Sequence, residues 1–377
     1  MSLWGPLQDR YETTRPRKLL ALDGGGIRGV ITLEILSKIE SALKSKSGKG
    51  DDFRLSDYFD YMAGTSTGAI IAAGLSIGMS VQELLDFYIS KGKDMFDRNS
   101  IIKQWKSLYE SGPLLNMLKE TFGAETDLII GKGKFRCLLL IVTMNRTTDS
   151  PWPVSNNPFA KYNDLNRPDC NAKIRLYQLV RASTAAPVYF PPETLQWDPD
   201  DPGKTFIFVD GGVTPYNNPA FLLYRMTTQP EYNLNWEKGE DKMLIVSVGT
   251  GAAPSGGEYR NILDTATGIS TNLMYAMQVD QDINCRTIGR CTYGDEIDRE
   301  VGTMISEQPL SVNTGKDFLY IRYNVALTRK DLDKLGLLNV DPDDVRKMDS
   351  VKYIDKLQKV GQASAKQVSL DHFGRFI

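Results

Sequence analysis

The chain has 377 residues, of which 41% are hydrophobic and 24% are charged, and its formal net charge is −2. This composition is typical of a folded globular protein and excludes a disordered, collagen-like or highly charged chain. Because the charges nearly balance, the chain lacks the basic character of nucleic-acid-binding proteins, and we expect no nucleic-acid polymer among its partners.

The first predicted elements alternate between strand and helix. A polar arm, residues 1–16, precedes the apolar run Lys18–Leu22, which predicts a strand, and apolar residues then recur at helical spacing over 27–43. A solvated loop is expected over 44–52. The pattern continues with a strand at Tyr58–Ala63, a helix at Ala69–Leu75, helical residues over 81–122 and a strand at Cys137–Val142.

The second part of the chain opens on a proline-rich stretch, 150–172, that predicts a long ordered loop. Phe318–Val325 alternates in polarity, as an edge or antiparallel strand does. Further strands are expected at Thr205–Val209 and Met243–Val248, and helices at Leu176–Ala182, Asn218–Met226, 261–280, 328–336 and 343–367.

This alternation favours an α/β fold with a mostly parallel central sheet and helices on both faces. No linker divides the sequence, so we expect one domain over 17–377, preceded by the arm. Within that domain, 81–122 is a candidate helical cap or lid and 328–377 a C-terminal helical extension. Several strands end in glycine-rich turns, and the carboxyl ends of the strands form the functional edge of such folds.

The sequence predicts no membrane-spanning segment. Its N-terminus lacks the apolar core of a secretory signal, and no run approaches the roughly 18 apolar residues of a membrane span. We therefore expect a cytoplasmic protein. Its four cysteines show neither a CxxC pair nor zinc-ligand spacing, so we expect reduced, buried thiols and neither a metal nor a cofactor.

A candidate nucleophile lies in Gly64-Thr65-Ser66-Thr67-Gly68, a G-x-S-x-G pattern between a predicted strand and a predicted helix. The flanking Gly64 and Gly68 permit a strained turn that lifts Ser66 clear of the sheet, with the N-terminus of the helix pointing at the site. Taken alone, the same five residues also suit a structural turn in which Ser66 caps the helix.

A glycine loop, Asp23-Gly24-Gly25-Gly26-Ile27-Arg28-Gly29, joins the first strand to the first helix. Its consecutive glycines leave backbone N–H groups exposed, as an oxyanion hole requires, and Arg28 adds a cation suited to a phosphate. The loop also satisfies G-x-G-x-x-G. A dinucleotide site needs an acidic residue at the end of the second strand, however, and that strand ends in Gly64–Gly68. We therefore reject a nicotinamide cofactor site.

A candidate base, Asp210, ends another predicted strand in the turn Asp210-Gly211-Gly212. An aspartate in this position acts either as a turn former or as a general base. Because His372 is the only histidine of the chain, Asp210 is the natural candidate to take the proton from Ser66. A Ser-His-Asp triad would require the C-terminal tail to carry His372 into the site.

Together and in this order, the three motifs resemble those of the patatin-like phospholipase family. That family has a D-G-G-G-x-R/K-G oxyanion loop, a G-x-S-x-G elbow and an aspartate in a D-G-G/A turn. Arg181–Pro192, Asn217-Asn218-Pro219 and Ser247–Gly251 also fit segments of the family. The resemblance extends over residues 17–255 and departs from the family at no catalytic position.

The resemblance implies a three-layer α/β/α sandwich and a lipid acyl hydrolase with a serine–aspartate dyad. Ser66 would attack the acyl carbonyl to form an acyl-enzyme, and Asp210 would act as base and then activate water. The implied oxyanion hole comprises Gly24, Gly25, Gly26 and Arg28, beside the elbow glycines Gly64 and Gly68.

Some bacterial members resemble nucleotide-activated phospholipases of antiphage defence. By that resemblance, the expected partners are a phospholipid membrane, met peripherally at its inner face, and a cyclic di- or trinucleotide activator, with a homo-oligomer forming on activation. Residues 95–122 interleave apolar and basic side chains as a membrane contact does. Arg286, Arg290 and Arg299 are candidates for phosphate contacts.

Two alternatives remain open. One is a housekeeping lipid esterase without nucleotide control. The other is a non-catalytic lipid-binding or storage protein, which the intact Ser66, Asp210 and glycine loop argue against.

Overall fold

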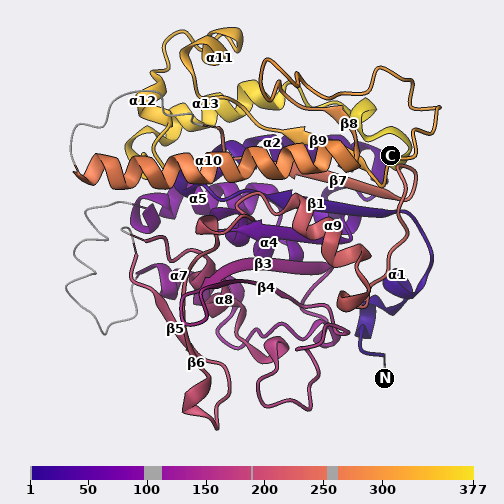
Figure 1. The fold of residues 1–377 in the computed structure, drawn as a ribbon, viewed down its shortest axis with the longest axis vertical. Coiled ribbons are helices and arrows are strands. Elements are labelled where there is room, and N and C mark those ends of the chain that lie inside the picture. The colour runs from indigo at the N-terminus through magenta and orange to yellow at the C-terminus, as the bar shows by residue number, and fades with distance from the viewer. Residues whose placement is uncertain (1, 97–112, 188–189, 253–261) are drawn as a thin grey trace.

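The computed structural model describes residues 2–96, 113–187, 190–252 and 262–377. Within these residues nine strands form one sheet in the order β5-β6-β3-β2-β1-β7-β9-β8, with β4 also paired to β3. In Figure 1, β9 lies near the top of the sheet and β6 near the bottom. The strands are β1 (Arg17–Leu22), β2 (Tyr61–Thr65), β3 (Leu138–Asn145), β4 (Ser150–Ser155), β5 (Glu193–Gln196), β6 (Thr205–Asp210), β7 (Met243–Val248), β8 (Arg290–Tyr293) and β9 (Leu319–Tyr323).

The centre of the sheet is parallel. From β8 to β3 every neighbouring pair of strands is parallel, whereas β4 and β6 run antiparallel to β3, and β5 runs antiparallel to β6. Every residue of β2, β7 and β9 is buried, so both faces of the sheet are covered there. The predicted α/β fold with a mostly parallel sheet is confirmed.

The helices pack on this sheet in two groups. α4 contacts β2 and β3 and lies beside α8, and α2 packs against both α5 and α13. α9 contacts β1 and β7, and α10 packs on α9 and crosses in front of the sheet in Figure 1. The described helices are α1 (Gln8–Glu12), α2 (Gly29–Ser47), α3 (Leu55–Tyr58), α4 (Thr67–Ser76), α5 (Val81–Phe96), α7 (Pro113–Phe122), α8 (Leu176–Ser183), α9 (Ala220–Thr228), α10 (Ile262–Ile288), α11 (Arg329–Lys334), α12 (Pro342–Val345) and α13 (Ile354–Ala365).

The prediction of a loop over 150–172 is wrong for the first residues of that range, which form β4. Pro151 and Pro153 pair with Met144 and Val142 of β3. β4 lies at an edge of the described sheet, where only one of its sides pairs with another strand. Proline, which has no N–H to donate, is tolerated in such an edge strand. The short strands β5 and β8 also went unpredicted.

The prediction that Phe318–Val325 is an edge or antiparallel strand is also wrong. β9 runs parallel between β7 and β8, and all five of its residues are buried. Tyr320, Arg322 and Asn324 produce the polar alternation in the sequence, but Tyr320 and Arg322 lie inside the protein. Elsewhere, α2 extends through Ser47 into the predicted loop 44–52 before Gly48 ends the helix in a left-handed conformation.

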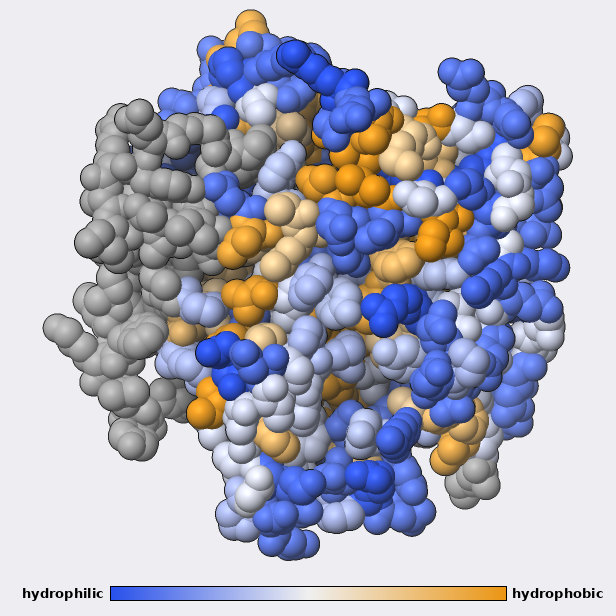
Figure 2. Space-filling model, in the orientation of Figure 1, coloured by the Kyte–Doolittle hydropathy of each residue, from blue (hydrophilic) through white to orange (hydrophobic). Residues whose placement is uncertain are grey.

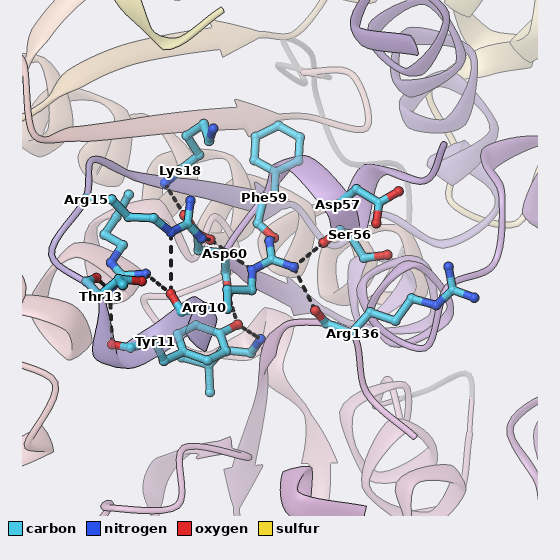
Figure 3. A network of polar contacts seen from close by, with 12 residues as sticks. Arg10, Tyr11, Thr13, Arg15, Lys18, Ser56, Asp57, Phe59, Asp60 and Arg136 are labelled. Atoms are coloured by element: carbon cyan, nitrogen blue, oxygen red, sulfur yellow. Dashed lines mark hydrogen bonds and ion pairs between the residues drawn. The ribbon is translucent and has the colours of Figure 1, made fainter. Parts of the chain in front are cut away.

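The N-terminal arm packs on the sheet through a buried polar network, which Figure 3 shows. Arg10 on α1 donates hydrogen bonds to the carbonyls of Ser56 (2.6 Å) and Phe59 (2.8 Å) and pairs with the buried carboxylate of Asp60. Asp60 also accepts a bond from the backbone N–H of Lys18, at 3.0 Å. The arm therefore joins the loop before β2 to the start of β1.

The candidate lid lies only partly within the described residues. α5 and α7 form its two ends, whereas Ile101, Ile102, Trp105, Leu108 and Tyr109 lie outside the part that the structure describes. None of the helices in the described ranges combines the length and apolarity needed to cross a bilayer. Figure 2 shows hydrophobic residues gathered in the upper middle of one face, where α10 crosses in Figure 1, and Leu273 on that helix is 53% exposed.

Candidate active site

The topology of the sheet brings the two candidate catalytic residues together. β2 and β6 share one edge of β3: Thr65 pairs with Val142, and Asp210 pairs with the next residue of β3, Thr143. Because β2 is parallel and β6 antiparallel to β3, their carboxyl ends meet head to head. Ser66 follows the end of β2 directly, so the two motifs converge although 144 positions separate them.

Ser66 occupies the strained turn that its motif predicts. Its backbone has φ 54° and ψ −122°, a conformation that a side-chain-bearing residue rarely adopts. The neighbouring glycines allow the close packing: a Cβ atom at Gly64 would collide with the backbone of Gly68, and one at Gly68 with the carbonyl of Leu22. α4 begins at Thr67, so its N-terminal dipole points at the nucleophile.

A direct hydrogen bond links the candidate nucleophile to the candidate base. The Ser66 Oγ donates to Asp210 Oδ2 at 2.6 Å, and the other carboxylate oxygen accepts the N–H of Gly212 at 2.6 Å. Both side chains are buried, with Ser66 at 8% and Asp210 at 4% exposure. The carboxylate is therefore held with one oxygen aimed at the serine hydroxyl.

Burial raises the pKa of Asp210 to about 6. The Ser66 hydroxyl, the Gly212 N–H and the positive charge of Arg181 oppose this shift, because each of them favours the ionised carboxylate. A pKa in this range suits a general base that must accept a proton and later release it near neutral pH.

The glycine loop lies beside Ser66, and its N–H groups divide into two sets. The Gly24 N–H donates to the carbonyl of Asn217 at 3.1 Å, so this predicted oxyanion donor is already engaged. Within the described residues no acceptor is recorded for the N–H groups of Gly25 and Gly26. These two are the donors that the loop leaves available for an oxyanion.

Arg28 is buried at 4% exposure and directed at main-chain carbonyls. Its Nη1 donates to the carbonyl of Arg346 at 3.2 Å, and its Nε lies 3.4 Å from the carbonyl oxygen of Gly25. The guanidinium thus contacts the same loop that carries the free N–H groups.

Several residues of the site were not assigned from the sequence. Ser183 Oγ accepts the N–H of Ser66 at 3.0 Å and donates to the carbonyl of Val142 at 2.6 Å. Thr250 Oγ1 donates to the carbonyl of Gly24 at 2.9 Å, and the carbonyl of Met348 accepts the Ile27 N–H at 2.9 Å. Ser183 and Thr250 lie in segments that fit the family pattern, but no sequence signal marks Met348.

His372 contacts residues other than the candidate nucleophile and base. Its Nδ1 lies 2.8 Å from the hydroxyl of Tyr323, and its ring stacks on Tyr293 at a centroid distance of 4.5 Å. Its recorded contacts include neither Ser66 nor Asp210, so the structure pairs the serine with the aspartate directly.

Two of the arginines considered for phosphate contacts are already occupied. Arg286 forms a two-pronged ion pair with Asp282, at 2.9 and 2.7 Å. Arg290 pairs with Glu240 at 3.2 Å and also donates to main-chain carbonyls. Both are at most 3% exposed, so the expected phosphate contacts have no support from these two guanidinium groups.

Comparison with known proteins relates the chain to a described family. A family model described as patatin-like phospholipase matches residues 20–224. A cGAMP-activated phospholipase of Escherichia coli is 33% identical over 224 residues, which cover 57% of each chain. A second one, from Vibrio cholerae, is 31% identical over 58% of this chain and 59% of its own. Each match thus takes in less than two thirds of the bacterial relative.

Plant and animal proteins extend the comparison. Patatin-17 of Solanum cardiophyllum is 30% identical over 69% of this chain and 67% of its own. The solved structure of human group IVD cytosolic phospholipase A2 has a similar fold, with a TM-score of 0.50 at 11% identity, over 99% of this chain and 62% of that one. The elbow, the aspartate turn and the glycine loop all lie within the residues that the family model matches. The chain belongs to the patatin-like phospholipase family.

Proposed function

We propose that the protein is a lipid acyl hydrolase that cleaves acyl esters of membrane phospholipids. The observation that carries this proposal is the 2.6 Å hydrogen bond from Ser66 Oγ to Asp210 Oδ2, made on a strained elbow beside two free backbone donors. Nucleophile, base and oxyanion donors are the parts that acyl transfer requires.

The proposed first step makes an acyl-enzyme. Asp210 takes the hydroxyl proton of Ser66 as Oγ attacks the acyl carbonyl, and the N–H groups of Gly25 and Gly26 bind the oxyanion that forms. The oxyanion then collapses, the ester C–O bond breaks, and Asp210 gives its proton to the departing lysophospholipid oxygen.

The second step releases the fatty acid. Asp210 takes a proton from a water molecule, whose oxygen attacks the acyl-enzyme carbonyl. Collapse of this second tetrahedral intermediate breaks the bond to Ser66 Oγ, which recovers the proton from Asp210. The same carboxyl group therefore serves both halves of the reaction, and a pKa near 6 suits both roles.

The finer proposal is that a cyclic di- or trinucleotide activates the enzyme in the cytoplasm, where it meets the inner face of the membrane peripherally and assembles into a homo-oligomer. The Escherichia coli and Vibrio cholerae relatives, both named cGAMP-activated phospholipases, support this proposal. The similarity to Patatin-17 favours the alternative of a constitutive lipid esterase.

Fatty-acid release from phospholipid vesicles tests both levels of the proposal. Ser66→Ala removes the nucleophile and should lower the rate by about 10⁴-fold or more, with an unchanged thermal midpoint showing that the variant is folded. A variant that keeps its activity would remove Ser66 from the mechanism. Adding cyclic di- and trinucleotides one by one to the wild-type protein tests the control, because full activity without any of them favours the constitutive esterase.

A further inference from the structure

A buried ion pair stands at the root of the glycine loop. Arg322 on β9 donates through both terminal nitrogens to Asp23, the residue before Gly24, at 2.8 Å (Nη1 to Oδ1) and 2.6 Å (Nη2 to Oδ2). The side chain of Asp23 is 0% exposed and that of Arg322 is 3% exposed. Such a bidentate pair fixes the orientation of a carboxylate as well as its position.

The pair reaches across a strand. β7 lies between β1 and β9, and its Ser247 pairs with Arg322 in the register of the sheet. The Arg322 guanidinium extends past this residue, donating to Ser247 Oγ at 2.7 Å, to meet Asp23 beyond the end of β1. Two strand spacings are about 10 Å, a span that suits the long arginine side chain.

Stability alone does not account for an ion pair in this place. The other residues of β9 are Leu319, Tyr320, Ile321 and Tyr323, all buried. Replacing a buried ion pair with well-packed apolar residues is often neutral or stabilising, because the pair must first be taken out of water. Burial also raises the pKa of Asp23, and the positive charge of Arg322 opposes this shift.

The loop that follows Asp23 is fixed by contacts on several sides. The Gly24 N–H binds the carbonyl of Asn217, the carbonyl of Gly24 binds Thr250, and the Ile27 N–H binds the carbonyl of Met348. The free donors of Gly25 and Gly26 lie between these anchors. A shift of about 1 Å at the root of the loop would move them away from the developing oxyanion, and errors of that size can cost about 10²-fold in rate.

We propose that Arg322 is a positioning residue of the oxyanion hole: through Asp23 it holds the glycine loop in the geometry that the transition state needs. This inference rests on the proposed acyl hydrolase. It also places a determinant of activity in β9, outside residues 20–224 that the family model matches.

Arg322→Lys tests the proposal because it keeps the charge but loses the two-pronged contact. We expect kcat to fall by about 10- to 100-fold with little change in KM, because the oxyanion hole acts on the transition state. A fluorophosphonate probe gives a second readout: Ser66 Oγ bonds to phosphorus as Asp210 takes its proton, and the P–F bond breaks to release fluoride. The P=O oxygen needs the same donors as the oxyanion. The labelling rate of the probe should fall in parallel with kcat.

Arg290→Lys is the matched control. Arg290 lies on β8, the strand beside β9, and is equally buried. It pairs with Glu240, away from the glycine loop. Both variants should lose stability, measured as the thermal midpoint, but only Arg322→Lys should lose kcat and labelling rate. Asp23→Asn should lower kcat by a similar factor. Combining it with Arg322→Lys should lower kcat little further, because the two substitutions disrupt the same interaction.

Two outcomes overturn the inference, and a third points elsewhere. If Arg322→Lys loses activity only in proportion to its unfolded fraction, or if Arg290→Lys loses kcat equally, Arg322 has a structural role alone. If instead the wild-type protein neither releases fatty acid nor reacts with the probe under any activating condition, the proposed function itself fails.

Discussion

Asp210 is a buried carboxylate that must be ionised to act as a base. Its pKa is raised to about 6, mainly by burial, so the folded protein stabilises the neutral form relative to a solvated aspartate. The active form of the dyad is therefore lost as the pH falls through about 6. The serine hydroxyl, the Gly212 N–H and Arg181 set this value by working against burial.

The pH profile of kcat/KM should accordingly show an acid limb with an apparent pKa of about 6. A histidine could produce a similar limb, because an ordinary imidazole has a pKa of about 6.5; burial lowers the pKa of His372 from its usual value. His372→Ala therefore distinguishes the two groups. We expect the limb and the rate to persist in this variant; loss of the limb, or a rate about 100-fold lower, would restore the histidine to the mechanism.

Among the secondary-structure elements, α8 supports the elbow most directly. Its last residue, Ser183, connects the N–H of Ser66 to the carbonyl of Val142 on β3. The hydroxyl thus ties the strained turn to the strand on which β2 and β6 meet.

Ser183→Ala should lower kcat by about 10-fold, because the elbow loses an anchor while the nucleophile remains. Ser364→Ala on α13 is the control, since that hydroxyl is also buried and also donates to a main-chain carbonyl, that of Val360. Initial rates and thermal midpoints of both variants check this prediction. Equal rates in the two variants would show that the elbow holds its shape without Ser183.

In the whole molecule, the C-terminal part of the chain contributes to the site, whereas the N-terminal arm packs elsewhere on the same sheet. β9 and the segment before α13 reach the glycine loop, while the N-terminal arm packs against Asp60, in the loop before β2. We propose that residues 17–377 form one domain for this reason. Catalytic geometry depends on the carboxyl ends of the strands, whereas the arm packs at the opposite ends and contributes to stability.

Arg10→Met should therefore lower the free energy of unfolding by about 2–4 kcal/mol, because the buried Asp60 loses a charged partner. The kcat of the folded variant should not change. Arg146→Met removes an exposed ion pair with Asp149 and should cost at most about 1 kcal/mol. Urea unfolding followed by fluorescence measures both; a lower kcat in folded Arg10→Met would contradict this separation of roles.

The sequence alone indicated the family and the α/β class, and it predicted a candidate nucleophile, a candidate base and the glycine loop. Ser66, Asp210 and the glycine loop lie in short turns whose chemistry is local, so the residue types reveal the backbone geometry that they permit. The prediction from sequence failed at β4, whose prolines suggested a loop, and at β9, whose alternating polarity suggested an edge or antiparallel strand. Strand pairing decided both conformations: β4 pairs with the preceding strand β3, and β9 lies between β7 and β8.

Only the tertiary structure decided how the parts of the site meet. β2 and β6 converge on β3, which puts Ser66 Oγ 2.6 Å from Asp210 Oδ2. The same structure engages the Gly24 N–H and ties the glycine loop to Arg322 and Met348. Local patterns cannot reveal such contacts, because they join residues that are far apart in the chain and depend on the order of strands in the sheet.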